Sequence, residues 1–234
     1  MSTTGPTFPL PGSGREIVFD TETTGIFPGD GHRIVEIGAV ELIDRVATGR
    51  TFHTYCDPCR PMPKDAEGVH GLSSKFLTGQ PVFEAVVDEF LAFIGDSPLV
   101  AHNAAFDMGF INWELRRAGL RELPLSRAID TLELSRKKHP GAKHTLDALC
   151  QRYGVDRSAR TKHGALLDAQ LLAQVYVELT GGRQIGLDLP VEEAMVVAVE
   201  ERVLVPARPH AATVDELARH SAFVATLKDP LWLS

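Results

Sequence analysis

Acidic residues stand at chemically suggestive positions along this chain of 234 residues. Asp20 and Glu22 lie two residues apart at the end of an apolar run, and a strand would turn both carboxylates to the same face. Two adjacent anions are costly unless a cation lies between them, and hard cations such as Mg²⁺ prefer oxygen ligands. The pair indicates a site for a divalent cation, although a lone Asp-x-Glu is more often two solvated acids at a strand end.

Three further residues strengthen this interpretation. Asp107 and Asp168 each fall in the first turn of an expected helix, and His163 precedes Asp168 by five residues. Taken singly, an acid at a helix start is favoured by the helix dipole, and a lone histidine is usually a surface or packing residue. Two helix starts and a strand end can, however, converge at one edge of a sheet. An imidazole that titrates near neutral pH could there take a proton from water.

The elements that must position these residues follow from the periodicity of apolar side chains. Short β-type runs over residues 16–20, 34–43 and 50–55 predict three adjacent antiparallel strands, the last two forming a hairpin. Asn103 stands at a helix N-cap position, and Asp130 caps another helix. Two later strands are expected, one over residues 98–101 and one that ends near residue 129. The expected helices cover residues 83–94, 104–118, 130–136, 145–153 and 165–180.

Strands first, then alternating helices and strands, indicate an α/β domain with a mixed five-stranded sheet covered by helices. Residues 1–14 are rich in Gly, Pro and Thr and predict a disordered lead. We expect the domain over residues 15–182. Residues 183–212 predict a linker, and residues 213–234 a C-terminal helix and tail.

Composition restricts the compartment and the chemistry. There is no apolar run long enough to span a bilayer, and the first residues lack the pattern of a signal peptide, so we expect a cytoplasmic protein. Three cysteines fit a reducing compartment. Cys56 and Cys59 form one CxxC pair that His53 and His70 could complete as a zinc site, but two thiols in a Pro-rich loop is the preferred interpretation.

The net charge of −7 argues against a protein that holds long DNA by neutralising many phosphates. The charge is nevertheless uneven. Residues 115–165 contain twelve Lys/Arg and five Asp/Glu, a local +7 that leaves −14 for the rest of the chain. A basic segment beside a carboxylate centre could hold a few nucleotides, and a set of solvated helix faces would explain it equally well.

Three sequence motifs are shared with a known family. Phe19-Asp-Thr-Glu-Thr-Thr-Gly25, Val100-Ala-His-Asn-Ala-Ala-Phe-Asp107 and His163-Gly-Ala-Leu-Leu-Asp-Ala-Gln170 resemble, in order and spacing, the motifs of the DnaQ-like DEDDh exonucleases. The likeness runs from about residue 16 to 182 and is closest to proofreading subunits of bacterial DNA polymerase III. It implies an RNase H-like exonuclease fold and a 3′→5′ exonuclease that proofreads DNA replication and releases nucleoside 5′-monophosphates.

The resemblance also implies residue roles. Two divalent cations, Mg²⁺ or Mn²⁺, would be held by Asp20, Glu22, Asp107 and Asp168, and His163 would be the general base. The residues expected along the path of the DNA 3′ end are Thr23, Thr24, His70, Asn103 and Phe106. For these the structural alternatives are stronger, because the threonines could shape a turn, Phe106 could be core and Asn103 only a cap.

Two segments beyond the domain predict protein partners. Thr213 to Glu216 forms a capping box that starts an amphipathic helix, and an isolated helix has no core of its own in which to bury its apolar stripe. It must fold back or dock, and the resemblance implies docking on the polymerase catalytic subunit through Leu217, Phe223, Val224, Leu227 and Trp232. Gln184, Leu187 and Leu189 resemble a short clamp-binding peptide, although an ordinary linker would look similar.

Two other functions remain open from the sequence. The DEDDh family includes RNA-trimming exonucleases, and the catalytic residues do not discriminate the sugar; the segment after residue 182 is what a free-standing RNA trimmer does not need. An inactive adaptor that tethers replication partners is disfavoured by the five intact catalytic positions. A nuclease assay with and without EDTA separates the adaptor from an enzyme.

Overall fold

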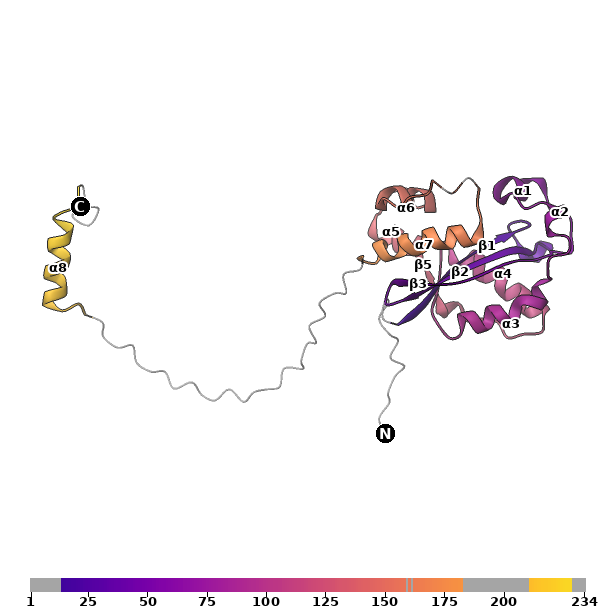
Figure 1. Ribbon diagram of the computed structural model, residues 1–234, viewed down its shortest axis with the longest axis horizontal. Coiled ribbons are helices and arrows are strands. Elements are labelled where there is room, and N and C mark those ends of the chain that lie inside the picture. The colour runs from indigo at the N-terminus through magenta and orange to yellow at the C-terminus, as the bar shows by residue number, and fades with distance from the viewer. Residues whose placement is uncertain (1–13, 159, 161, 183–210, 229–234) are drawn as a thin grey trace, which may run out of the picture. The chain divides into compact units, whose positions relative to one another are not determined.

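The computed structural model describes residues 14–158, 160, 162–182 and 211–228. The chain divides into two compact units, and the boundary lies between Leu187 and Asp188. The first unit contains the sheet and its covering helices, and the described part of the second, residues 211–228, contains one helix (Figure 1). Each unit is described by itself.

The first unit is built on a five-stranded mixed sheet, which confirms the expected fold class. Its strand order is β3-β2-β1-β4-β5. Pairing is antiparallel between β1 and β2 and between β2 and β3, and parallel between β1 and β4 and between β4 and β5. The strands are β1 (Arg15–Thr23), β2 (Ile34–Ile43), β3 (Val46–Tyr55), β4 (Leu99–Ala101) and β5 (Ala128–Asp130).

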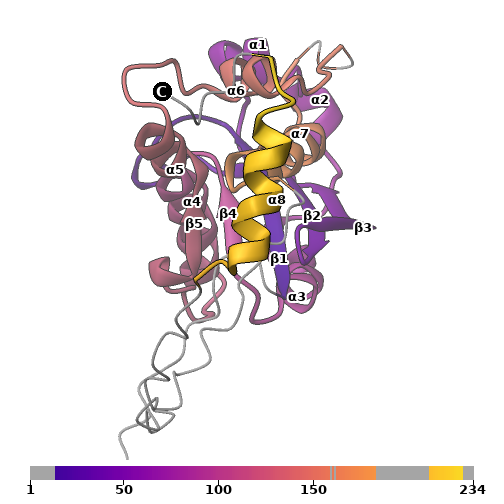
Figure 2. The ribbon, with the colours of Figure 1, turned by 90° about the vertical axis from the view of Figure 1, so that its left-hand side faces the viewer.

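Helices cover both faces of the sheet. The strands lie between α7 on one side and α3 on the other (Figure 1, Figure 2). The helices of this unit are α1 (Lys64–His70), α2 (Ser74–Leu77), α3 (Phe83–Ile94), α4 (Ala104–Arg117), α5 (Thr131–Lys138), α6 (Leu146–Tyr153) and α7 (Ala165–Leu179), with 3-10 turns η1 (Pro28–Asp30) and η2 (Leu125–Arg127).

The alternation of side chains along β1 divides the core between these two layers. Ile17 and Phe19 belong to the cluster that packs under α3 and α4, whereas Val18 belongs to the cluster under α7. All three are fully buried. Since the period of a strand is two residues, the same alternation decides which way the acidic residues farther along β1 point.

A buried ion pair ties α4 to the start of β2. The Arg33 guanidinium donates to both carboxylate oxygens of Glu114 at 2.6 and 2.8 Å, and the backbone N–H of Ile34 also donates to Glu114. Glu114 is fully buried, so the pair replaces the water that both charges have lost. The contact fixes the helix that carries Asp107.

Several expectations about local structure need correction. β1 continues to Thr23 through its pairing with β2, so Asp20 lies inside the strand and Glu22 is its last residue but one. β3 begins at Val46 because the hairpin turns at Asp44 and Arg45, both with positive φ. Two short helices, α1 and α2, were not predicted, because they are too short for an apolar period to be visible.

The N-cap assignments have different outcomes. Asp130 accepts a hydrogen bond from the backbone N–H of Leu132, as expected, and the Thr145 side chain caps α6, which was not predicted. Asn103 does stand at the N-cap position of α4, but its side chain makes no capping hydrogen bond. Its backbone is left-handed, with φ 68°, and its N–H donates to Asp130. The prediction that the Asn103 side chain caps α4 is therefore wrong.

The second unit contains α8 (Val214–Val224), which begins with the expected capping box between Thr213 and Glu216. Val224 is buried, whereas the side chains of Leu217, Phe223 and Leu227 are exposed. The 1–13 lead, the clamp-peptide residues Gln184, Leu187 and Leu189, and Trp232 lie outside the described residues. Within the described ranges, no helix has the length and apolarity needed to cross a membrane.

Candidate active site

The pleat of β1 directs its polar residues to two different helices. Asp20 and Glu22 share the side of Val18, which faces α7, whereas Thr21 shares the side of Phe19, which faces α4. The sequence prediction that both carboxylates share one face is therefore consistent with the packing. Thr21, which lies between them, contacts α4 instead.

Thr21 holds the carboxylate of Asp107 against β1. Both its backbone N–H, at 3.0 Å, and its hydroxyl, at 2.7 Å, donate to Asp107 Oδ1. Asp107 lies in the first turn of α4 and is buried. Two donors on one oxygen leave Oδ2 available, so Asp107 can still present an oxygen to a cation near Asp20.

The start of α7 lies directly on β2. Gly38 pairs with Asp20 across the β1–β2 ladder. A Cβ at Gly38 would lie 2.1 Å from the backbone nitrogen of Leu166 and 2.3 Å from the carbonyl carbon of Ala165. Only glycine allows this approach, and the approach brings the first turn of α7, which carries Asp168, over Asp20 and Glu22.

His163 and two carboxylates meet at this point. Ligand atoms of Glu22, His163 and Asp168 all lie within 4.8 Å of one another, and within the described part of the chain this is the group of His, Cys, Asp or Glu side chains that could hold a metal ion. His163 Nδ1 lies 3.3 Å from Asp168 Oδ2, and the His163 side chain is 50% exposed. The cluster is thus open to solvent on the histidine side.

Electrostatics make the carboxylates poor anions when no cation is present. Burial, followed by repulsion from Asp107, Glu22 and Asp168, raises the pKa of Asp20 well above its ordinary value. Burial and the charge of Asp168 raise the pKa of Glu22 to about 8. Burial raises the pKa of Asp107 to about 7 despite the Thr21 hydrogen bonds. An oxygen-rich site that resists ionisation in this way is the environment that a divalent cation stabilises.

An arginine that sequence reasoning did not assign completes the cluster. Arg160 donates from Nε to Asp168 Oδ1 at 2.5 Å and from Nη2 to Asp168 Oδ2 at 2.7 Å. The same Nη2 lies 2.8 Å from His163 Nδ1, and Nη1 donates to Asp147 Oδ1 at 2.9 Å. Its position in the basic segment 115–165 was the one available signal, and that signal did not distinguish it from eleven other basic residues.

The two threonines after Glu22 are engaged within their own loop. Thr23 Oγ1 donates to the carbonyl of Gly25, and Thr24 Oγ1 accepts from the backbone N–H of Arg33 and contacts His32. Thr24 is fully buried. These bonds are those of residues that shape a turn, which was the structural alternative. A role for Thr23 and Thr24 in holding the terminal nucleotide stays a prediction.

The other expected substrate residues differ in exposure. Asn103 is exposed, and its side chain is not used for capping. Phe106 is partly buried and packs on Phe110 with ring centroids 5.0 Å apart. His70 is buried, and burial lowers its pKa. Phe106 is thus in part a core residue, and contacts of Asn103, Phe106 and His70 with DNA stay predictions.

Among the described residues, Cys56, Cys59, His53 and His70 do not form a group whose ligand atoms could hold a metal ion. Cys56 is buried and Cys59 exposed, both as free thiols. His53 lies 2.7 Å from Glu36 instead. Burial raises the pKa of the Cys56 thiol to about 12, so it does not act as a thiolate.

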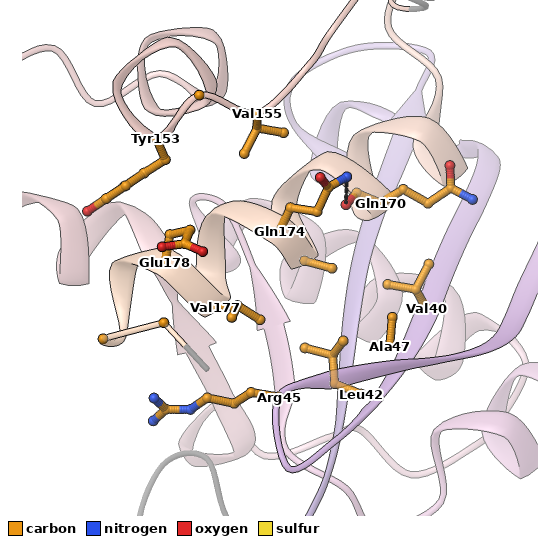
Figure 3. A pocket seen from close by; sticks show the side chains of 14 residues that line it. Val40, Leu42, Arg45, Ala47, Tyr153, Val155, Gln170, Gln174, Val177 and Glu178 are labelled. Carbon is orange, nitrogen blue, oxygen red and sulfur yellow. Dashed lines mark hydrogen bonds between the residues drawn. The ribbon is translucent and has the colours of Figure 1, made fainter. Parts of the chain in front are cut away.

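A cavity of about 870 Å³ lies apart from these residues (Figure 3). It is bounded by β2, the start of β3, and the later turns of α7, with side chains such as Val40, Leu42, Ala47, Gln174 and Val177 around it. The five predicted catalytic residues are not among its lining. The predicted catalysis is therefore not assigned to this cavity.

A mixed sheet with acidic side chains from β1, α4 and α7 gathered at one point defines a metal-dependent exonuclease. The family model described as Exonuclease matches residues 17–176, and the chain belongs to this family. Relatives named DNA polymerase III subunit epsilon extend the likeness beyond the domain. That of Rickettsia felis is 49% identical over 224 residues, covering 91% of this chain and 96% of the relative. That of Escherichia coli K12 is 43% identical over 221 residues, covering 89% of this chain and 91% of the relative.

Solved structures agree on the fold. Exonuclease X in complex with 5′ overhanging duplex DNA has a TM-score of 0.54 and 28% identity, covering 71% of this chain and 90% of that one. The nuclease domain of 3′hExo, a DEDDh family member bound to rAMP, has a TM-score of 0.63 and 19% identity, covering 72% and 92%. The expected RNase H-like exonuclease fold is confirmed, and this family generally uses divalent metal ions.

Proposed function

We propose that this 3′→5′ exonuclease proofreads DNA as a subunit of DNA polymerase III, with two divalent cations, Mg²⁺ or Mn²⁺, at Asp20, Glu22, Asp107 and Asp168. The site assignment rests on carboxylates from β1, α4 and α7 that converge with His163. One ligand atom of His163 lies within 4.8 Å of ligand atoms of both Glu22 and Asp168. The raised pKa values of Asp20, Glu22 and Asp107 support a cation at this point.

The reaction is hydrolysis of the last phosphodiester bond at a DNA 3′ end. When bound, the cations stabilise the charge that develops on the phosphate and on the leaving oxygen. The charges of Asp107, Glu22 and Asp168 all raise the pKa of Asp20, so Asp20 would contribute to both metal positions. Thr21 keeps Asp107 in place through its two hydrogen bonds.

His163 is the general base of this proposal. Its half-exposed ring can reach a water molecule at the rim of the site, and Asp168 lies 3.3 Å from Nδ1. His163 takes the proton as the water oxygen bonds to phosphorus. The bond from phosphorus to the 3′ oxygen of the preceding nucleotide breaks, that oxygen is protonated by solvent, and a nucleoside 5′-monophosphate leaves.

The site accommodates a frayed or single-stranded end more readily than a paired one. A site that reads only a few nucleotides must separate a paired terminus first, and mismatched ends separate at least cost. We therefore expect mismatched 3′ ends to be removed faster than matched ends. The test is a time course on 5′-labelled duplexes that differ only in the terminal pair.

The decisive experiment is a nuclease assay on 5′-labelled single-stranded DNA. Shortening of the labelled strand from its 3′ end, with loss of activity in EDTA and recovery on Mg²⁺ or Mn²⁺, supports the proposal. The matched control is Asp20→Asn, which keeps the shape of the side chain but removes its charge. Activity that survives EDTA, or cleavage of closed circular single strands, would contradict a metal-dependent exonuclease acting from the 3′ terminus.

The RNA-trimming alternative needs a direct comparison of sugars, because the site residues do not discriminate them. The likeness to the epsilon subunit of Rickettsia felis over 91% of this chain favours DNA. An RNA strand of the same sequence should be shortened more slowly under identical conditions. Faster shortening of RNA would favour the alternative.

The polymerase contact of the proposal is made by α8 and the segment around it. Leu217 and Phe223 are 55% and 62% exposed, on a helix whose capping box gives it a defined start. Exposed apolar residues at helical spacing suit a groove on a partner. Leu227 and Trp232 complete the proposed surface, whereas Val224, which was also expected there, is buried. Binding of the full chain to the catalytic subunit, and its loss on replacing Leu217 and Phe223 with Ser, test this part.

A sliding clamp is the second proposed partner, bound by Gln184, Leu187 and Leu189. Replacement of all three residues should weaken clamp binding without changing the cleavage rate on free single-stranded DNA. Unchanged clamp affinity would contradict this part of the proposal.

The proposal also places the protein in the cytoplasm, because a subunit of the replicative polymerase works on chromosomal DNA.

A further inference from the structure

Arg160 occupies both oxygens of a carboxylate that the proposed function assigns to metal binding. Its Nε and Nη2 donate to Asp168 Oδ1 and Oδ2 at 2.5 and 2.7 Å. Only 8% of the Arg160 side chain and 4% of the Asp168 side chain are exposed, so the pair is largely shielded from water. A bidentate, buried pair of this kind is among the stronger contacts that an arginine makes.

The same guanidinium also engages the proposed base. Arg160 Nη2 lies 2.8 Å from His163 Nδ1, and an arginine nitrogen is always the donor in such a contact. The lone pair of Nδ1 is then directed to Arg160 and not to water. One side chain thus takes up the oxygens of Asp168 and one ring nitrogen of His163.

Arg160 has a second carboxylate within reach. Its Nη1 donates to Asp147 Oδ1 at 2.9 Å, on α6 and away from the carboxylate cluster. Asp147 is 48% exposed and also binds Arg157 at 2.9 Å. Arg160 could therefore leave Asp168 while keeping a charged partner.

We propose that Arg160 is an internal counter-ion of the metal-free enzyme, which a divalent cation displaces from Asp168. The proposal rests on the proposed metal site. A guanidinium and a divalent cation cannot share the same two oxygens without bringing like charges into contact, so one must give way. Arg160 neutralises Asp168 before the metal arrives, and its withdrawal towards Asp147 frees Asp168 for the metal and Nδ1 of His163 for a proton.

The test is Mn²⁺ binding to the full chain, measured by titration calorimetry without DNA. Arg160→Gln removes the competitor and should tighten Mn²⁺ binding by roughly tenfold or more, the scale of a lost charge-assisted pair. Arg160→Lys keeps the positive charge but cannot occupy both oxygens, and should tighten binding to an intermediate extent. Unchanged or weaker Mn²⁺ binding in both variants would overturn the proposal.

Arg157→Gln is the matched control for net charge. It removes one positive charge that contacts Asp147 but not Asp168, so Mn²⁺ affinity should stay within about twofold of that of the unchanged protein if competition for Asp168 is what matters. A gain as large as that of Arg160→Gln would mean that long-range charge alone explains the effect, and the displacement idea would be wrong.

Thermal unfolding in EDTA gives a readout independent of metal titration. Without its counter-ion the metal-free domain should melt at a lower temperature, so Arg160→Gln widens the difference between the melting temperatures in EDTA and in Mn²⁺. An unchanged difference would count against the proposal. If the unchanged protein binds no Mn²⁺ at all, the proposed metal site itself fails; if it binds Mn²⁺ and Arg160→Gln binds no more tightly, only the role of Arg160 fails.

Discussion

The backbone nitrogen of Leu166 lies 2.1 Å from the point that a Cβ on Gly38 would occupy. This contact sets the distance between α7 and the sheet at the position where Gly38 pairs with Asp20. Asp168 lies in the same turn of α7 as Leu166, and its backbone N–H donates to Gly164 at 2.8 Å. The separation of Asp20 and Asp168 therefore depends on a residue that has no side chain.

We expect Gly38→Ala to impair cleavage strongly. The methyl group would collide with backbone atoms that cannot rotate away, so the start of α7 must move, and a shift of about 1 Å in a catalytic group can cost on the order of 10²-fold in rate. Overpacking of this kind also costs about 1–3 kcal/mol of stability. Single-strand cleavage and thermal unfolding measure the two effects.

Gly109→Ala is the control for this substitution. Gly109 lies in α4, and a Cβ there would meet no atom within 4 Å. Alanine should leave folding unchanged or stabilise the helix slightly. Equal loss of activity in the two variants would show that the close approach at Gly38 does not matter.

Replacing His163 with Ala should reduce turnover by about 10²- to 10⁴-fold, because a positioned general base contributes on that scale. Mn²⁺ binding should be largely retained, since the carboxylates remain. Steady-state cleavage and metal titration on the same preparation test the two statements together. A variant with nearly full rate at neutral pH would show that His163 is not the base.

The raised carboxylate pKa values predict an unusual pH dependence of stability in the absence of metal. Glu22 and Asp107 hold protons in the folded state up to about pH 8 and 7, whereas in the unfolded chain they ionise near pH 4. The folded state binds more protons between these limits, so the free energy of unfolding falls as the pH rises through this window. Added Mg²⁺ should restore stability most at the alkaline end.

Glu22→Gln isolates this effect. His70 and His102, whose pKa values burial lowers, act in the opposite direction, so the informative quantity is the difference between the unchanged protein and the variant. In EDTA the variant should become relatively more stable as the pH rises from about 5 to 8. A difference that stays constant over this range would contradict the raised pKa of Glu22.

Removing the partner of Arg33 should destabilise the domain. Glu114→Ala leaves a largely buried guanidinium without its bidentate acceptor, and loss of one member of a buried pair costs about 3–5 kcal/mol. Chemical denaturation measures the change. Glu122→Ala is a suitable comparison, because its pair with Arg116 is exposed and should contribute little.

A protein that ends at Gly182 should stay folded and cleave free single-stranded DNA at the normal rate. The sheet, both covering layers and the carboxylate cluster all lie before that residue. The shortened protein should lose association with the polymerase catalytic subunit, which co-purification measures. Loss of folding or of intrinsic activity would indicate that the C-terminal segment packs on the domain, and full polymerase binding would exclude docking through α8.

Much of this organisation could be predicted from periodicity and residue type. The mixed sheet, the long helices and the capping box at Thr213 follow from local patterns, because an amphipathic helix or a buried strand must repeat its apolar residues at a fixed period. The short α1 and α2 gave no such signal. Asn103 was misjudged as a side-chain cap because its conformation depends on a hydrogen bond from its N–H to Asp130, 27 residues away along the chain.

The family and the proposed catalytic set could be predicted from the sequence, because the spacing of Asp20, Glu22, Asp107, His163 and Asp168 within three motifs is a linear property of the chain. How those side chains are held could not be predicted in this way. Thr21 fixes Asp107, Gly38 admits α7, and Arg160 pairs with Asp168, and each contact joins segments whose separation and direction depend on the packing of helices on a sheet. No local pattern encodes such contacts, since they exist only when the pleat of β1 and the first turns of α4 and α7 meet.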